Sequence, residues 1–148
     1  MTKKAYLSQP LTLDHRISYH AEQLSRLRRE ADAVYSVWGE RIAAGGNEAP
    51  YVRALQRIQA LEEVIAEECA LYERLREQVE QVIRNLPQEK MRLALMYHYL
   101  EGLSFSRIGE KLFMDRGTAF RWASRGLQSL VLPEEPVTIY GELCNGCL

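Results

Sequence analysis

The residues best suited to chemistry in this sequence are cations spaced along one short stretch. Arg116, Arg121 and Arg125 follow one another at intervals of five and four, with Thr118 and Phe120 between them. On a helix these residues would share an outward face, because apolar or small residues recur every three or four positions and face inward. The inward positions are Ala119, Trp122, Gly126 and Leu130. Guanidinium groups bind phosphates and guanine edges, so this face predicts contact with nucleic acid.

The residues before this helix predict a second, shorter helix and a tight turn. Ser104 is a candidate N-cap for the first helix, and Asp115 is a candidate N-cap for the second. Ile108 and Leu112 are four apart and share the buried face of the first helix. Residues 113–115 form the turn. A short helix, a turn and a cationic second helix are typical of a helix-turn-helix that reads the major groove.

This stretch resembles region 4 of bacterial sigma factors, which binds the promoter's upstream −35 element. The match begins at Leu86-Pro87 and continues without a gap through residue 127 of the 148. The matching residues are Glu101-Gly102-Leu103-Ser104, Ile108, Leu112, Thr118, Arg125 and Leu127. The layout of the whole chain also resembles small phage and mobile-element proteins of Gram-positive bacteria, regarded as late-gene or element-transfer transcription regulators. The resemblance implies a sequence-specific regulator of transcription that binds double-stranded DNA.

The resemblance also implies roles for single residues. The residues expected to contact DNA are Arg116, Thr118, Phe120, Arg121, Arg125 and Lys111. Arg116 or Arg121 would make a bidentate contact with guanine, and Phe120 would pack on a thymine methyl group. Lys111 and Arg125 would hold phosphates. The chain lacks the other sigma regions, so we do not expect it to act alone as a complete sigma factor.

Three positions depart from the family pattern. Phe113 stands where the family usually has Gly or Asn, at the left-handed end of the first helix, and costs about 1 kcal/mol there if the turn keeps its shape. Gly109 replaces a usual Ala, which would permit close packing of helices. Gly117 lies early in the second helix and has no side chain with which to read a base. The recognised DNA sequence therefore does not transfer from the family.

Two long helices are predicted before this module. Apolar residues repeat at spacings of three and four over residues 13–38 and again over 51–86. His20 and Glu68 are the exceptions in the two stripes. We expect His20 to be packed or at an edge rather than to bind metal, and Glu68 either to set the register or to lie at the edge. Residues 43–50, AAGGNEAP, break the pattern and predict the turn of an antiparallel hairpin.

The sequence thus predicts an all-α protein with four parts. They are a flexible leader at 1–12, a long antiparallel helical hairpin at 13–86, a helix-turn-helix domain at 87–130 and a C-terminal tail at 131–148. Residues 88–100 would form the supporting helix of the domain. Val137 to Tyr140 has strand propensity without an obvious partner, and we expect a flexible tail.

A monomer is expected rather than a homodimer. With Trp38 opposite Tyr51, the first helix ends before it can cover Val79, Val82 and Leu86. That surface is about 100–200 Å², too little to drive dimerisation alone, and the helix-turn-helix domain would cover it. The hairpin would set the oligomeric state or hold a partner, of which RNA polymerase is one candidate.

Charge and cysteine content bound the remaining possibilities. Residues 88–130 hold seven Arg/Lys and four Asp/Glu, giving +3 in a chain of net charge −1. Three cysteines, no signal-peptide pattern and no long apolar run predict a cytoplasmic protein without a membrane segment. Cys144 and Cys147 lack the further ligands that structural zinc needs, so no cofactor is expected. A metal shared across a dimer or a regulatory disulfide stays open.

No catalytic constellation is present, and an enzyme is not expected. Two other functions stay open. One is a phage DNA-packaging or recombination accessory protein, which would bind at a packaging site rather than upstream of genes. The other is an interaction protein, such as an anti-activator, whose module has lost DNA binding; Phe113 and Gly117 are the features that support it.

Overall fold

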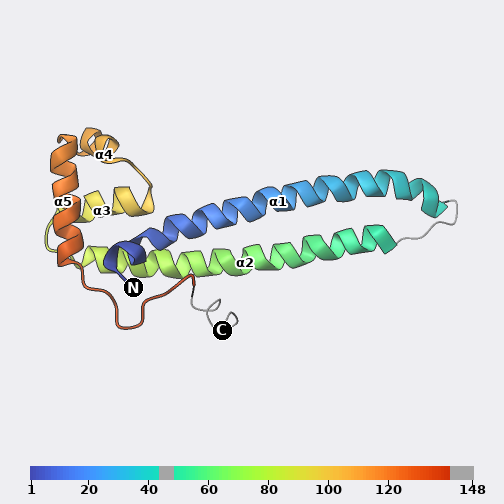
Figure 1. Ribbon diagram of the computed structural model, residues 1–148, viewed down its shortest axis with the longest axis horizontal. Coiled ribbons are helices and arrows are strands. Elements are labelled where there is room, and N and C mark those ends of the chain that lie inside the picture. The colour runs from blue at the N-terminus through green and yellow to red at the C-terminus, as the bar shows by residue number, and fades with distance from the viewer. Residues whose placement is uncertain (44–48, 141–148) are drawn as a thin grey trace. The chain divides into compact units, whose positions relative to one another are not determined.

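The computed structural model describes residues 1–43 and 49–140, and their side chains except those of residues 38–43. The described chain is helical and contains no β-strand (Figure 1). Its helices are α1 (Lys3–Ala43), α2 (Ala49–Arg84), α3 (Glu89–Leu95), the π-helical η1 (Met96–Leu100), α4 (Phe105–Leu112) and α5 (Arg116–Ser129). The prediction of an all-α protein with two long helices at its start is confirmed.

The chain divides into two compact units. One, which we call the terminal unit, combines Met1–Asp14 with Leu71–Leu148; the other, the hairpin unit, is His15–Ala70. The predicted boundary at residue 87 falls inside the terminal unit, because the start of α1 and the end of α2 belong with α3, α4 and α5.

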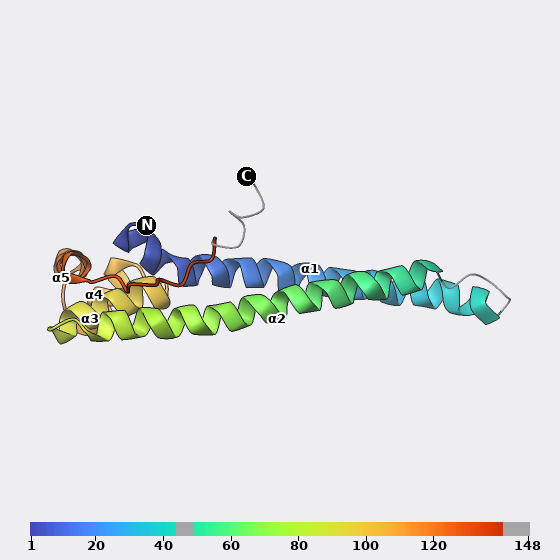
Figure 2. The same ribbon diagram turned by 90° about the horizontal axis from the view of Figure 1, so that it is seen from below.

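In the hairpin unit α1 and α2 run antiparallel (Figure 2). The rings of Tyr35 and Tyr51 have centroids 5.2 Å apart, and His20 lies against Glu68. Higher residue numbers in α1 therefore pair with lower numbers in α2, as the expected register requires. The period of three and four residues fixed this arrangement, because each stripe needs a cover and the short connection brings the other stripe against it.

The two polar exceptions in the helical stripes contact each other. His20 Nδ1 lies 2.5 Å from Glu68 Oε1, and Arg16 Nε lies 4.0 Å from Glu68 Oε2. Glu68 is 9% exposed, so the carboxylate is taken from water and relies on these two neighbours. His20, which is half-buried, and Glu68, which is buried, thus form one polar pair between α1 and α2.

We predict that His20→Leu lowers the free energy of unfolding by about 1–3 kcal/mol, since it leaves Glu68 buried without its closest partner. The double variant His20→Leu/Glu68→Leu should be within about 1 kcal/mol of the parent, or more stable, because an apolar pair suits the seam. Urea titrations of the parent, both single variants and the double variant measure the coupling. Arg28→Ala is the control, since its ion pair with Glu62 is exposed. Additive effects of the two substitutions would contradict the pairing.

The expected flexible leader is wrong, because α1 already begins at Lys3. Tyr6 and Leu7 are fully buried, and the Tyr6 hydroxyl donates to Gln78 Oε1 at 2.9 Å. Burial raises the pKa of Tyr6 to about 12. Pro10 lies inside α1 and has no N–H to donate to the Tyr6 carbonyl. The Gln9 side chain takes over that role, with Nε2 donating to the Tyr6 carbonyl at 3.3 Å.

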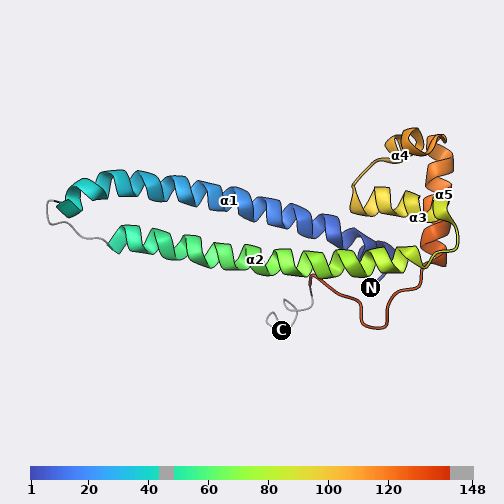
Figure 3. The same cartoon turned by 180° about the vertical axis from the view of Figure 1, so that it is seen from behind.

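The segment that follows α5 is held by two glutamines, which corrects the expectation of a flexible tail up to residue 140. The Val137 N–H donates to Gln78 Oε1 at 2.8 Å, and the Val137 carbonyl accepts from Gln9 Nε2 at 3.1 Å. The Ile139 N–H donates to Gln9 Oε1 at 3.0 Å, and Gln78 Nε2 donates to the Glu135 carbonyl at 3.1 Å. Figure 3 shows this segment returning from α5 towards α2. We call Gln9 and Gln78 together the glutamine clamp. It satisfies main-chain groups that the lack of a strand partner would have left unpaired.

The end of the long helical stripe lies inside the terminal unit. Val79, Val82 and Leu86 are 0%, 8% and 4% exposed. The surface that the first helix was expected to leave uncovered is therefore buried within the unit that contains α3, α4 and α5. The monomer itself remains a prediction. Cys144 and Cys147 lie outside the described residues.

Candidate nucleic-acid interface

The candidate interface is built on α4, the turn of residues 113–115 and α5. Ser104 caps α4 as expected, with its hydroxyl accepting from the Arg107 N–H at 3.4 Å. Phe113 ends α4 in the left-handed conformation, with φ 55° and ψ 47°, and 97% of it is exposed. Glycine and asparagine adopt this left-handed conformation most easily, and phenylalanine adopts it at a cost of about 1 kcal/mol.

Gly109 allows the turn to approach α4 closely. A Cβ atom at this position would lie 2.5 Å from the Met114 carbonyl oxygen, and the Met114 N–H donates to the Gly109 carbonyl at 2.9 Å. Only a residue without a side chain fits at this distance, so the glycine that departs from the family's alanine determines the path of the turn. Gly109 was expected to permit close packing of helices, but the atoms that approach it most closely belong to the turn, at Met114 and Asp115.

The inward face of α5 packs on α3 through small residues. Ala119, Ala123 and Gly126 are buried. A Cβ atom at Gly126 would lie 2.9 Å from Leu95 Cδ1 and 3.3 Å from Met91 Cβ. This close approach lets the main chain of α5 at Gly126 lie directly against the side chains of Leu95 and Met91. The opposite face of α5 is therefore presented to solvent.

Trp122 is half-buried at the edge of this packing rather than fully inward as expected. Its ring lies between two cations, with Lys90 Nζ 5.7 Å and Arg125 Cζ 5.5 Å from the ring centroid. Cation–π contact orders both side chains along the edge of α5. Sequence reasoning missed Lys90, because nothing in its local spacing links α3 to the cationic face.

The six residues predicted to contact DNA differ in their exposure. Arg116, Arg121 and Arg125 are exposed, and Phe120 is 54% exposed. Thr118 is half-buried. Lys111, on α4, is also exposed, with Nζ 5.8 Å from the centroid of the Tyr97 ring. The structure therefore places all six candidates on α4 and α5.

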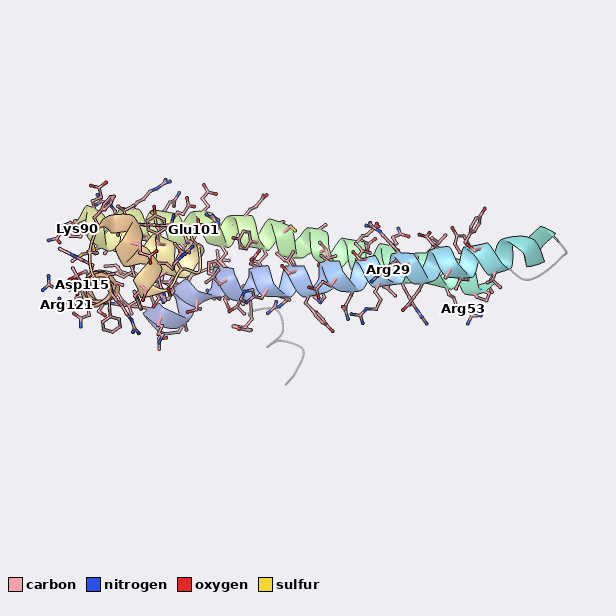
Figure 4. All side chains as sticks on the ribbon, turned by 90° about the horizontal axis from the view of Figure 1, so that it is seen from above. Arg29, Arg53, Lys90, Glu101, Asp115 and Arg121 are labelled. Carbon is pink, nitrogen blue, oxygen red and sulfur yellow. The ribbon has the colours of Figure 1, made fainter. Side chains whose placement is uncertain are left out.

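The first turn of α5 carries a small polar network. The Thr118 hydroxyl donates to the Asp115 carboxylate and accepts from Arg121 Nη2 at 3.3 Å, while Arg121 Nε donates to the Gly117 carbonyl at 3.3 Å. The hydrogen bond from Thr118, together with the charge of Arg121, lowers the pKa of Asp115. Figure 4 shows the labelled side chains of Asp115 and Arg121 near each other. Asp115 keeps the N-cap position, but its side chain accepts from Thr118 instead of capping the helix.

Phe120 is held in place by a series of aromatic contacts. Its ring meets Phe105 edge-on at 5.3 Å between centroids, and Phe105 stacks on His98 at 4.3 Å. His98 Nδ1 lies 2.9 Å from the Leu103 carbonyl oxygen. The exposed edge of Phe120 is thus pre-positioned with little conformational freedom to lose on binding. The sequence shows that the three rings are present. It does not show that they contact one another, because those contacts depend on how the helices pack.

No protein-family model, no curated protein and no solved structure matches this chain. Among the described residues, no helix has the length and apolar character needed to cross a membrane. In the same part of the chain, no group of three or more His, Cys, Asp or Glu side chains is arranged to hold a metal ion. Cys69 is a free, exposed thiol on α2.

Proposed function

We propose that this protein binds double-stranded DNA in a sequence-specific way and regulates transcription. The observation that carries the proposal is the exposed cationic face of α5. Arg116, Arg121 and Arg125 are exposed on a helix whose buried side includes Gly126, in close contact with Leu95. A rigid helix with cations on its free side suits the major groove, which admits one α-helix.

The local contacts support separate tasks for the side chains. The Arg121 side chain is already held by hydrogen bonds to Thr118 and Gly117, so a bidentate contact with guanine would cost it less rotamer entropy. Phe120, supported by Phe105, offers an apolar edge for a thymine methyl group. Lys111 and Arg125 would bind phosphates on either side and set the register on the duplex.

Regulation of transcription follows from the resemblance of residues 86–127 to sigma region 4. On this proposal the protein acts in the cytoplasm as a monomer, with RNA polymerase as a candidate partner and without a cofactor. A phage or mobile-element origin is part of the same proposal. A genome-wide map of bound DNA tests function directly. Sites upstream of genes are expected, whereas binding at a packaging or recombination site would assign the accessory role instead.

The cationic face also predicts how single substitutions change DNA binding. Arg116→Ala and Arg121→Ala should each lose about 1–3 kcal/mol at a duplex selected from a random pool, with little change on unrelated DNA. Arg125→Ala should weaken binding to all duplexes about equally and lower the salt slope by about 1. Fluorescence anisotropy at several salt concentrations measures both quantities.

Arg74→Ala is the control for this series, since Arg74 is an exposed arginine on α2 and outside the interface. Its affinity should equal that of the parent. Small and equal effects at all three positions on α5 would mean that this face does not read DNA. A parent protein that binds no duplex at all would favour an interaction protein that has lost DNA binding, for which the exposed Phe113 is the feature to test.

A further inference from the structure

The hairpin unit carries a groove between α1 and α2 that neither helix fills. One part has a volume of about 560 Å³, and the adjoining part, which shares Leu27, Glu30 and Arg57 with it, has about 260 Å³. Its apolar lining comes from both helices and includes Leu27, Val34, Ala60, Leu61 and Val64. The lining spans residues 23–34 of α1, which corresponds to roughly 16 Å of helix. That length equals three turns of a third helix laid beside the pair.

The hairpin unit has little core of its own. Among its described residues, Leu24 and Ala31 are the buried apolar side chains. Leu27 and Leu61 are half-buried, and Val64 is 41% exposed. Two helices cover each other along one line only, so their apolar stripes stay partly open on the flanks. On the groove flank, that open apolar surface is available to a partner.

The two flanks of the hairpin differ in their charges. Arg28 and Glu62 close one flank with an ion pair of 2.9 Å. The groove flank carries Arg26, Arg53 and Arg57, and none of the three forms an ion pair with another described residue. Glu30 is the acidic residue among those that line the groove, so the lining has an excess of two positive charges. The groove therefore has an apolar surface with unpaired arginines beside it. A helix with an apolar stripe flanked by carboxylates would be complementary to it.

We infer that this groove binds an amphipathic α-helix of another protein, whose apolar face is flanked by Asp and Glu. The apolar face would pack on Leu27, Leu61 and Val64 and complete a three-helix bundle. The acidic flanks would pair with Arg26 and Arg57. A second copy of this chain fits less well, because a two-fold contact would place the arginines of one groove against those of the other. The inference is independent of the proposed DNA binding.

Two synthetic peptides of 21 residues test the inference. Both carry Leu at alternating spacings of three and four; one has Glu at the flanking positions, and the other has Lys. Fluorescence anisotropy with the full chain should give a Kd of roughly 10–100 µM for the Glu peptide. The Lys peptide should bind at least tenfold more weakly. Equal binding of the two peptides, or no binding of the Glu peptide at 1 mM, would overturn the inference.

Charge reversal makes the test specific to the groove. Arg26→Glu/Arg57→Glu changes two exposed side chains, so circular dichroism should show an intact helical fold. This variant should prefer the Lys peptide, whereas Arg29→Glu, which alters an exposed arginine of α1 outside the groove lining, should keep the preference of the parent. Light scattering over a hundredfold concentration range completes the test. A mass twice 17.1 kDa that falls to the monomer value in the double variant would assign the groove to a second copy and reject the partner helix.

Discussion

Leu75→Asp is expected to unfold the terminal unit. Leu75 is 0% exposed, and a carboxylate placed there would have no room for water. An unpaired buried charge costs about 4 kcal/mol or more, a large share of the 5–15 kcal/mol that stabilises a typical domain. Because α5 belongs to the same unit, the variant should also lose any DNA binding. Circular dichroism with urea titration measures the loss, and Leu75→Met is the control because it conserves volume.

Leu61→Asp provides a contrast within the same helix. Leu61 is half-buried and lines the groove of the hairpin unit, where the new carboxylate can reach solvent. We expect a loss of only about 1–2 kcal/mol. Equal effects at positions 61 and 75 would show that the two halves of α2 have equally tight cores, which the difference in burial between them argues against.

Gly109→Ala should be the most damaging single-methyl change in α4, the turn of residues 113–115 and α5. The added Cβ would lie 2.5 Å from the Met114 carbonyl oxygen, and this neighbour is main chain rather than a side-chain end that can rotate away. The turn must shift, at a cost of about 2–3 kcal/mol even though alanine favours helix by about 1 kcal/mol. The free energy of unfolding and the affinity for a selected duplex should fall together, because the turn sets the start of α5.

Gly117→Ala is the matched control for this change. A Cβ atom at Gly117 would lie 3.4 Å from Asp115 Oδ2, an ordinary contact. The substitution should therefore raise stability by up to about 1 kcal/mol through helix propensity. If Gly109→Ala were as well tolerated as Gly117→Ala, the close approach of the turn to α4 would be disproved.

Much of the fold follows from local rules that a single sequence displays. The stripes over residues 13–38 and 51–86 predicted paired helices because burial of an apolar stripe requires a partner at the same period. Ser104 marked the start of α4, because a hydroxyl at that position satisfies an amide of the first turn. The left-handed conformation of Phe113, in contrast, was expected from the resemblance to sigma region 4 and not from its residue type.

Features that depend on distant pairs were harder to predict. His20 and Glu68 were each recognised as exceptions, yet their contact appears only when the register with Trp38 opposite Tyr51 is followed along both helices. The hydrogen bond by which the Gln9 side chain compensates for Pro10 leaves no periodic pattern in the sequence. The contacts of Lys90 with Trp122 likewise depend on how α3 packs against α5, which spacing along the chain does not show.

The glutamine clamp has a consequence for the order in which the chain folds during synthesis. Gln9 and Ile139 are 130 positions apart, and the terminal unit needs both. A ribosome releases the chain from its N-terminus, so Tyr6 and Leu7 emerge long before the segments that bury them. The hairpin unit is continuous in sequence and can close first. Nascent chains that stop before residue 135 should hold a formed hairpin and an incomplete terminal unit, and should depend on chaperones to shield the first turns of α1.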